Sequence, residues 1–82
     1  MPRLPRNLSG AELIRGLSAY GYAATRQTGS HVRLTRVGAS GEQHLTIPSH
    51  AALRVGTLHS IVSEAARQLG KSKEALLQDL FS

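Results

Sequence analysis

Two stretches of alternating apolar and polar residues, joined by a glycine-bounded loop, constrain the fold of this chain most. Residues 31–37 read HVRLTRV and residues 43–48 read QHLTIP, with Gly38-Ala39-Ser40-Gly41 between them. Alternation with a period of two is typical of a strand with one buried face, and two such runs across a short glycine loop predict an antiparallel hairpin. Pro48 ends the second run because it has no amide hydrogen to donate to the ladder.

The register of this hairpin follows from its apolar residues. A shift by one residue would place apolar side chains opposite polar ones, so the favoured register is the one that pairs Val37 with Glu42. That register aligns two apolar pairs, Leu34 with Leu45 and Val32 with Ile47. The other face of the hairpin then carries polar side chains from both strands: His31, Arg33, Thr35, His44 and Thr46.

The residues before the hairpin predict a helix and a short strand. Ser9-Gly10-Ala11-Glu12 is a capping-box sequence, and the apolar residues after it recur at helical spacing, so a helix is expected from Gly10 to Tyr20. Gly21 is a natural end for this helix. Residues 22–27 are expected to form a strand, and Thr28-Gly29 a turn.

The residues after the hairpin predict two more helices. Thr57 is expected to cap a second helix, which carries an apolar face and ends at Gly70. Ser72 is expected to cap a short third helix over residues 72–81. The resulting order predicts a two-layer α+β sandwich, α-β-β-β-α with a short extra C-terminal helix, in a single domain over residues 1–82 with its core at about 8–69. Double-stranded-RNA-binding domains have the same order of elements, which is an analogy of fold alone.

Composition narrows the classes of partner. Lys and Arg number 10 against 5 acidic residues, which gives a net charge of +5 and an isoelectric point near 10.8. Such a balance predicts a polyanionic partner, and charge alone leaves nucleic acid, an acidic protein and an anionic membrane open. The absence of Cys excludes disulfides, thiol catalysis and Cys-ligated zinc. No apolar run is long enough to span a membrane, and the first residues lack the apolar core of a secretion signal, so a cytoplasmic protein without membrane association is expected.

The acidic residues do not predict a metal centre. Glu12, Glu42, Glu64, Glu74 and Asp79 lie in different elements or do not share a helical face, and no two of them form a motif. We therefore expect no metal and no other cofactor. Histidine can exchange protons at neutral pH, and cleavage of RNA without metal needs a base for the ribose 2′-hydroxyl, an acid for the leaving 5′ oxygen and a nearby cation.

The sharpest local motif is Gly29-Ser30-His31 at the start of the second strand. The glycine allows a tight turn beside a phosphate, and His31 is expected on the polar face with Arg33, close to Arg26 across the turn. Arg26, Arg33, Arg36 and His50 are the candidate RNA-binding residues. The same tripeptide also fits an ordinary hairpin turn, and the residues alone do not select His31 over His50 as the catalytic group.

Four motifs in order resemble those of one family. They are Tyr20-Gly21-Tyr22 after the first helix, the segment from Arg26 to His31, Thr46-Ile47-Pro48-Ser49-His50, and Gly56-Thr57-Leu58-His59-Ser60-Ile61. Together they resemble the HicA-type mRNA interferase toxins over about residues 8–69. The loop at residues 49–56 carries only Arg54, where many relatives are richer in lysine, and the C-terminal helix is longer than some relatives need.

The resemblance implies a fold and an activity. HicA-type proteins have a fold similar to double-stranded-RNA-binding domains, cleave mRNA, and use the histidine of the Gly-Ser-His motif, which is His31 here, with Gly29 and Ser30 in support. A HicB-type antitoxin that covers the active site neutralises them. Two other functions stay open at this point: an RNA-binding module of the same fold that does not cut, and an interaction domain whose basic face binds an acidic protein.

Overall fold

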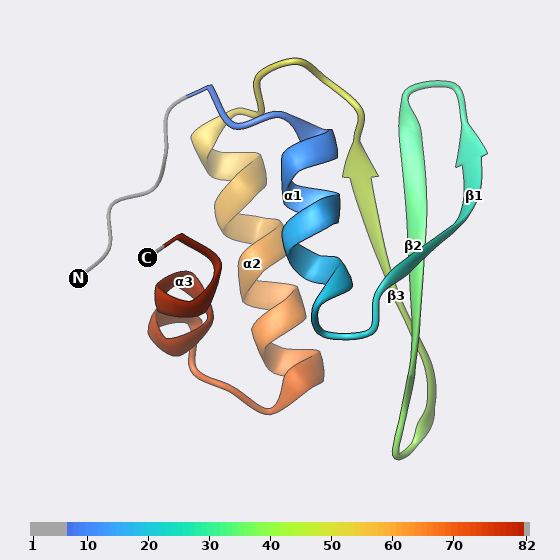
Figure 1. Ribbon diagram of the computed structural model, residues 1–82, viewed down its shortest axis with the longest axis vertical. Coiled ribbons are helices and arrows are strands. Elements are labelled where there is room, and N and C mark those ends of the chain that lie inside the picture. Colours follow the sequence, from blue (N-terminus) through green and yellow to red (C-terminus); the bar gives the residue numbers. More distant parts are fainter. Residues whose placement is uncertain (1–6, 82) are drawn as a thin grey trace.

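The computed structural model describes residues 7–81 and has the predicted order of elements (Figure 1). Three helices and three strands follow one another as α1 (Gly10–Ser18), β1 (Ala23–Thr28), β2 (His31–Gly38), β3 (Gly41–Pro48), α2 (Val55–Leu69) and α3 (Lys73–Phe81). The strands form one antiparallel sheet in the order β1-β2-β3. α1 and α2 lie on one side of the sheet, and α3 packs beside α2 away from the strands (Figure 1). The α+β fold class is therefore confirmed.

The register of the β2–β3 hairpin is the predicted one. Val37 pairs with Glu42, and the two apolar pairs, Leu34 with Leu45 and Val32 with Ile47, are aligned across the strands. All four apolar side chains are buried. The loop is tighter than expected, because Gly38 and Gly41 pair with each other and leave only Ala39 and Ser40 to turn the chain. The alternation of the two strands was thus sufficient to predict their pairing.

The core lies between the helices and the inner face of the sheet. Leu13 and Leu17 of α1 are almost completely buried, as are Leu58 and Val62 of α2. Tyr22, just before β1, is 1% exposed, and its hydroxyl donates to the side-chain oxygen of Gln68 at 2.7 Å. Burial raises the pKa of the Tyr22 phenol, because the charged form would lose its hydration. The described residues contain no helix with the length and apolar character needed to cross a membrane.

The start of α2 differs from the prediction. Thr57 does not cap this helix: its N-cap is Arg54, whose side chain makes no capping hydrogen bond, and the helix begins at Val55. The physical reason is a tertiary anchor, since Leu53 is buried and its N–H donates to the carbonyl of Leu8 at 2.7 Å. This anchor directs the chain into the helix two residues before the predicted cap. The ends of α1 and β1 also differ from the predicted ends, by one or two residues.

The start of α1 is fixed tightly against the end of β3. The predicted capping box is present, because Ser9 Oγ accepts from the Glu12 N–H at 3.0 Å and the Glu12 carboxylate accepts from the Ser9 N–H at 3.1 Å. The Gly10 N–H donates to the His50 carbonyl at 3.0 Å. A Cβ atom on Gly10 would lie 2.0 Å from the Pro48 carbonyl oxygen, so only glycine permits this approach.

α3 is held to the rest of the molecule by apolar and polar contacts. Leu76 and Leu77 are buried in the core, and Ser72 caps the helix as predicted through the Ala75 N–H. The Asp79 carboxylate accepts from the Tyr20 hydroxyl at 3.0 Å and from the Lys71 ammonium at 2.5 Å. These partners lower the pKa of the Asp79 carboxyl below its ordinary value. The helix therefore covers the side of α2 that faces away from the sheet.

Candidate nucleic-acid interface

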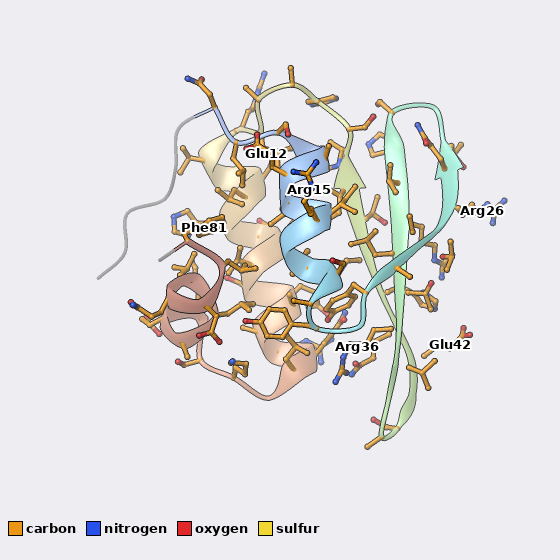
Figure 2. All side chains as sticks on the ribbon, in the orientation of Figure 1. Glu12, Arg15, Arg26, Arg36, Glu42 and Phe81 are labelled. Carbon is orange, nitrogen blue, oxygen red and sulfur yellow. The ribbon has the colours of Figure 1, made fainter. Side chains whose placement is uncertain are left out.

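The face of the sheet that points away from the helices is open and polar. Figure 2 shows Arg26 and Glu42 directed away from the helices, whereas Arg36 lies on their side of the sheet. Exposed or half-buried polar side chains from all three strands make up this open face: Arg26 and Thr28 of β1, His31, Arg33 and Thr35 of β2, and Glu42, His44 and Thr46 of β3. The structure thus places the predicted polar residues of β2 and β3 on one accessible surface.

His31 lies in a depression with two arginines. Its volume is about 180 Å³, and its lining residues are Arg26, Thr28, His31, Arg33 and Thr46. The pairing of the strands explains the set, because Arg33 is opposite Arg26 on one side and Thr46 on the other. In the described part of the chain neither arginine forms a salt bridge, so both guanidinium groups can bind an anion. We call this the His31 depression.

The Gly-Ser-His segment forms the tight turn between β1 and β2. Thr28 and His31 pair with each other, so Gly29 and Ser30 alone reverse the chain. Gly29 has a φ of +58°, and a Cβ atom there would meet nothing within 4 Å. Glycine is therefore favoured by the backbone conformation and not by lack of space, as expected at the first central position of a two-residue hairpin loop.

The same turn is tied to the segment that follows β3. The Ser30 carbonyl accepts from the Ser49 N–H at 2.6 Å, and His31 pairs with Pro48. His50 is exposed and comes directly after this contact, with its carbonyl held by Gly10. The structure thus brings the backbone of the His50 segment to the end of the sheet that carries His31, but His50 is not among the residues that line the His31 depression.

Arg36 is not brought to the open face. Its Nε donates to the Tyr20 carbonyl at 3.0 Å, and a terminal nitrogen donates to the Gln43 side-chain oxygen at 2.5 Å. These contacts hold the end of the α1 segment against the sheet. The alternation of β2 indicates this position, because Arg36 has the same parity as the buried Val32 and Leu34. Its predicted contact with RNA therefore receives no support from the geometry.

A polar network on the open face was not foreseen from the sequence. The hydroxyls of Thr25 and Thr35 are 2.7 Å apart, and Thr35 Oγ1 is 3.0 Å from His44 Nδ1. Although Thr35 and His44 were expected on this face, Thr25 joins them only because the β1–β2 register shifts between Ala24 and Arg26. A single-residue irregularity of this kind has no clear signature in a sequence without glycine at that point.

The hollow between α1 and α3 is different in kind. It has a volume of about 320 Å³ and is lined mainly by apolar side chains, with Glu12 and Arg15 at its edge and Phe81 opposite (Figure 2). It contains no histidine and lies away from the open face of the sheet. Within residues 7–81 the structure brings together no group of three or more His, Asp or Glu side chains that could hold a metal ion.

Comparison with known proteins identifies the family. The family model described as HicA toxin of bacterial toxin-antitoxin matches residues 10–71, which is more than half of the chain. This chain belongs to the HicA toxin family. It is therefore the toxin of a toxin–antitoxin system, and membership in the HicA family implies an antitoxin as its partner. The match covers α1, the sheet and α2, and ends before α3 begins.

The other comparisons add no relatives to the HicA match. Neither the curated proteins nor the solved structures contain a significant match to the chain. The likeness to double-stranded-RNA-binding domains therefore stays a prediction from the order of elements.

Proposed function

We propose that this HicA toxin is an endoribonuclease that cleaves mRNA in the cytoplasm without a metal ion. The observation that supports this proposal best is the His31 depression, where an exposed histidine shares one small hollow with Arg26 and Arg33. An imidazole can transfer protons at neutral pH, and two guanidinium groups that form no salt bridge among residues 7–81 can bind the phosphate at which the reaction occurs.

The proposed reaction transfers a phosphoryl group within RNA, from the 5′ oxygen of one nucleotide to the 2′ oxygen of the nucleotide before it. His31 acts as catalytic base or acid in the depression. The ribose 2′-hydroxyl loses its proton to a base, its oxygen forms a bond to phosphorus, and the bond from phosphorus to the 5′ oxygen breaks as that oxygen receives a proton. Arg26 and Arg33 stabilise the negative charge that develops on the phosphoryl oxygens. Gly29 and Ser30 support the site by forming the turn that positions His31.

A second group completes the proton transfers. His50 follows the Ser49 amide that binds the Ser30 carbonyl, so its backbone lies at the end of the sheet that carries His31, and it is one candidate. A phosphate oxygen of the substrate could serve instead. The substitution His50→Ala separates the two, because loss of an acid or base lowers a cleavage rate by about 10²–10⁴-fold.

The antitoxin is proposed to be a HicB-type protein that covers the open face of the sheet. The toxin carries a net charge of +5, and its open face presents two arginines free of salt bridges among the described residues. A partner that covers this face blocks access of RNA to His31. An antitoxin with acidic side chains at this interface would also complement its charge.

The deciding experiment compares His31→Ala with a matched histidine control. His59 lies in the first turns of α2 and does not line the His31 depression, so His59→Ala removes an imidazole away from the proposed site. We expect the wild type and His59→Ala to arrest growth and to cleave RNA, and the cleavage to continue in the presence of a chelator. An equally folded His31→Ala should do neither. Arrest by all three proteins without cleavage would instead indicate an RNA-binding module that does not cut.

A further inference from the structure

A second depression adjoins the His31 depression on the same face. It has a volume of about 350 Å³ and is lined by Thr25, Arg26, Arg33, Thr35, Glu42 and His44. Arg26 and Arg33 line both depressions. When these two arginines hold a phosphate of RNA beside His31, the neighbouring nucleotides therefore lie next to the second depression.

The floor of the second depression is an ordered polar network. Thr25, Thr35 and His44 come from β1, β2 and β3, and the contacts of 2.7 Å and 3.0 Å join their side chains across the whole sheet. Because Thr35 holds the Nδ1 atom of His44, the other ring nitrogen is directed to the side where Glu42 lies. The distance from His44 Nε2 to the nearer Glu42 carboxylate oxygen is 3.6 Å, which is too long for a hydrogen bond.

Glu42 gives this depression a chemical preference of its own. It is a carboxylate on the open face of a basic protein, with a side chain that is 68% exposed. Within residues 7–81 it has no salt bridge to Lys or Arg, and its oxygens remain available as acceptors. A carboxylate repels phosphate but accepts hydrogen bonds from N–H groups. The ligand that fits is therefore an uncharged group with N–H donors, attached to a phosphate that Arg26 and Arg33 bind.

We infer that the second depression is a nucleobase subsite that prefers guanine. The base-pairing edge of guanine carries two adjacent donors, N1–H and N2–H₂, which match the two oxygens of one carboxylate, whereas the other three bases present a single donor group on that edge. Single-stranded RNA exposes this edge when its bases are unstacked. The inference adds a base preference to the proposed function, and the position of the subsite near the cut rests on that function.

The position of the recognised base follows from the length of β2. The Glu42 carboxylate lies 3.6 Å from His44, which pairs with Thr35, and Thr35 is four residues beyond His31, or about 13 Å along an extended strand. A stacked single strand advances about 3.4 Å per nucleotide, so the recognised guanine lies within about four nucleotides of the cut, and closer when the bases are unstacked.

Binding of RNA that cannot be cleaved tests the subsite by itself. 2′-O-methyl oligonucleotides lack the attacking hydroxyl, so fluorescence anisotropy can compare an all-uracil oligonucleotide with versions carrying one central guanine, adenine or cytosine. We expect the wild type to bind the guanine version about tenfold more tightly than the uracil one, the scale of one bidentate contact to a base. Glu42→Gln should abolish most of this ratio.

The control removes the same charge elsewhere. Glu74→Gln, at an exposed position of α3, also raises the net charge by one, so both variants strengthen general binding to RNA while only Glu42→Gln changes the ratio between bases. Equal affinity of the wild type for all four oligonucleotides, or an unchanged ratio in folded Glu42→Gln, overturns the inference.

Mapping of cut sites separates this inference from the proposed function. Cuts in a random RNA pool with guanine enriched within about four nucleotides support both. Cuts without any enriched base overturn the subsite and leave the nuclease in place. A guanine preference in binding, with no cuts by the wild type, supports the subsite and refutes the nuclease.

Discussion

The close approach of Gly10 to Pro48 leads to a strong prediction about stability. In Gly10→Ala the new Cβ atom would lie 2.0 Å from the Pro48 carbonyl oxygen and 3.0 Å from its carbon, both of them backbone atoms that cannot rotate away. The start of α1 must therefore separate from the end of β3. Overpacking of this kind costs about 1–3 kcal/mol, and losing the Gly10 hydrogen bond to His50 adds about 0.5–1.5 kcal/mol. We expect a total loss of about 1.5–4.5 kcal/mol.

This loss is large for a chain of this size. A protein of 82 residues has a free energy of unfolding of about 4–12 kcal/mol, so Gly10→Ala should remove a large fraction of it. Urea denaturation measures the change directly, and the melting temperature should fall by about 6 °C or more.

Gly56→Ala is the matched control for this measurement. Gly56 lies in the first turn of α2, and a Cβ atom there would meet nothing within 4 Å. The same substitution should therefore stabilise the protein by up to about 1 kcal/mol through helix propensity. If Gly10→Ala unfolds at the same urea concentration as the wild type, the contact with Pro48 does not constrain the fold and the reasoning is refuted.

Two further predictions separate roles that look alike in the sequence. Arg33→Ala should weaken RNA binding and lower the slope of log affinity against log salt by about one. Arg36→Ala should leave that slope unchanged and lower the melting temperature, because the contacts of Arg36 are with Tyr20 and Gln43. Equal slopes in the two variants would contradict this division. The Glu64 carboxyl is expected to titrate near pH 2, because hydrogen bonds from Arg67 and Gln68 lower its pKa from 4.5 to about 2. Since the folded-state pKa is the lower one, the stability that this carboxylate contributes is present above pH 4.5 and is lost as the pH falls through about 2. An NMR titration of the carboxyl carbon with its midpoint near 4.5 would show that these hydrogen bonds are absent in solution.

The sheet was predictable because its information is local and periodic. The β2–β3 hairpin alternates over Val32 to Thr35 and over His44 to Ile47, and only one register places Val32 opposite Ile47 and Leu34 opposite Leu45 on the buried face, so the pairing could be predicted from the sequence. The same parity rule places Arg36 on the helix side. Its inclusion with the RNA-binding residues followed from charge and ignored parity.

The parts that could not be predicted depend on contacts between distant residues. Thr57 is of a residue type that often caps helices, but the hydrogen bond from Leu53 to Leu8 sets the start of α2 earlier. Thr25 is joined to His44 through Thr35 only because the β1–β2 register shifts between Ala24 and Arg26, and no residue type in β1 predicts this shift. In both cases tertiary structure overrides a local preference.

The residues at the centre of the candidate site could be predicted, whereas the polar network beside them could not. The placement of His31 and Arg33 on one face, with Arg26 across the turn, follows from the hairpin, and the structure places all three in one depression. Neither the residues nor the geometry selects the second group for proton transfer, and the catalytic role of His31 stays a prediction until the His31→Ala variant is measured.

The way in which the Gly-Ser-His turn is held has a consequence for the order in which the protein is made. His31 has Thr28 on one side and Pro48 on the other, and the carbonyl before it is bound by Ser49. A chain still growing on the ribosome that extends past His31 but has not yet reached residue 48 contains the whole motif but only one of its two neighbouring strands in full. The contacts around His31 therefore form only after more than half of this chain has been synthesised. A truncated product ending before β3 would contain the Gly-Ser-His motif without the pairing to Pro48 and the Ser49 hydrogen bond that hold it.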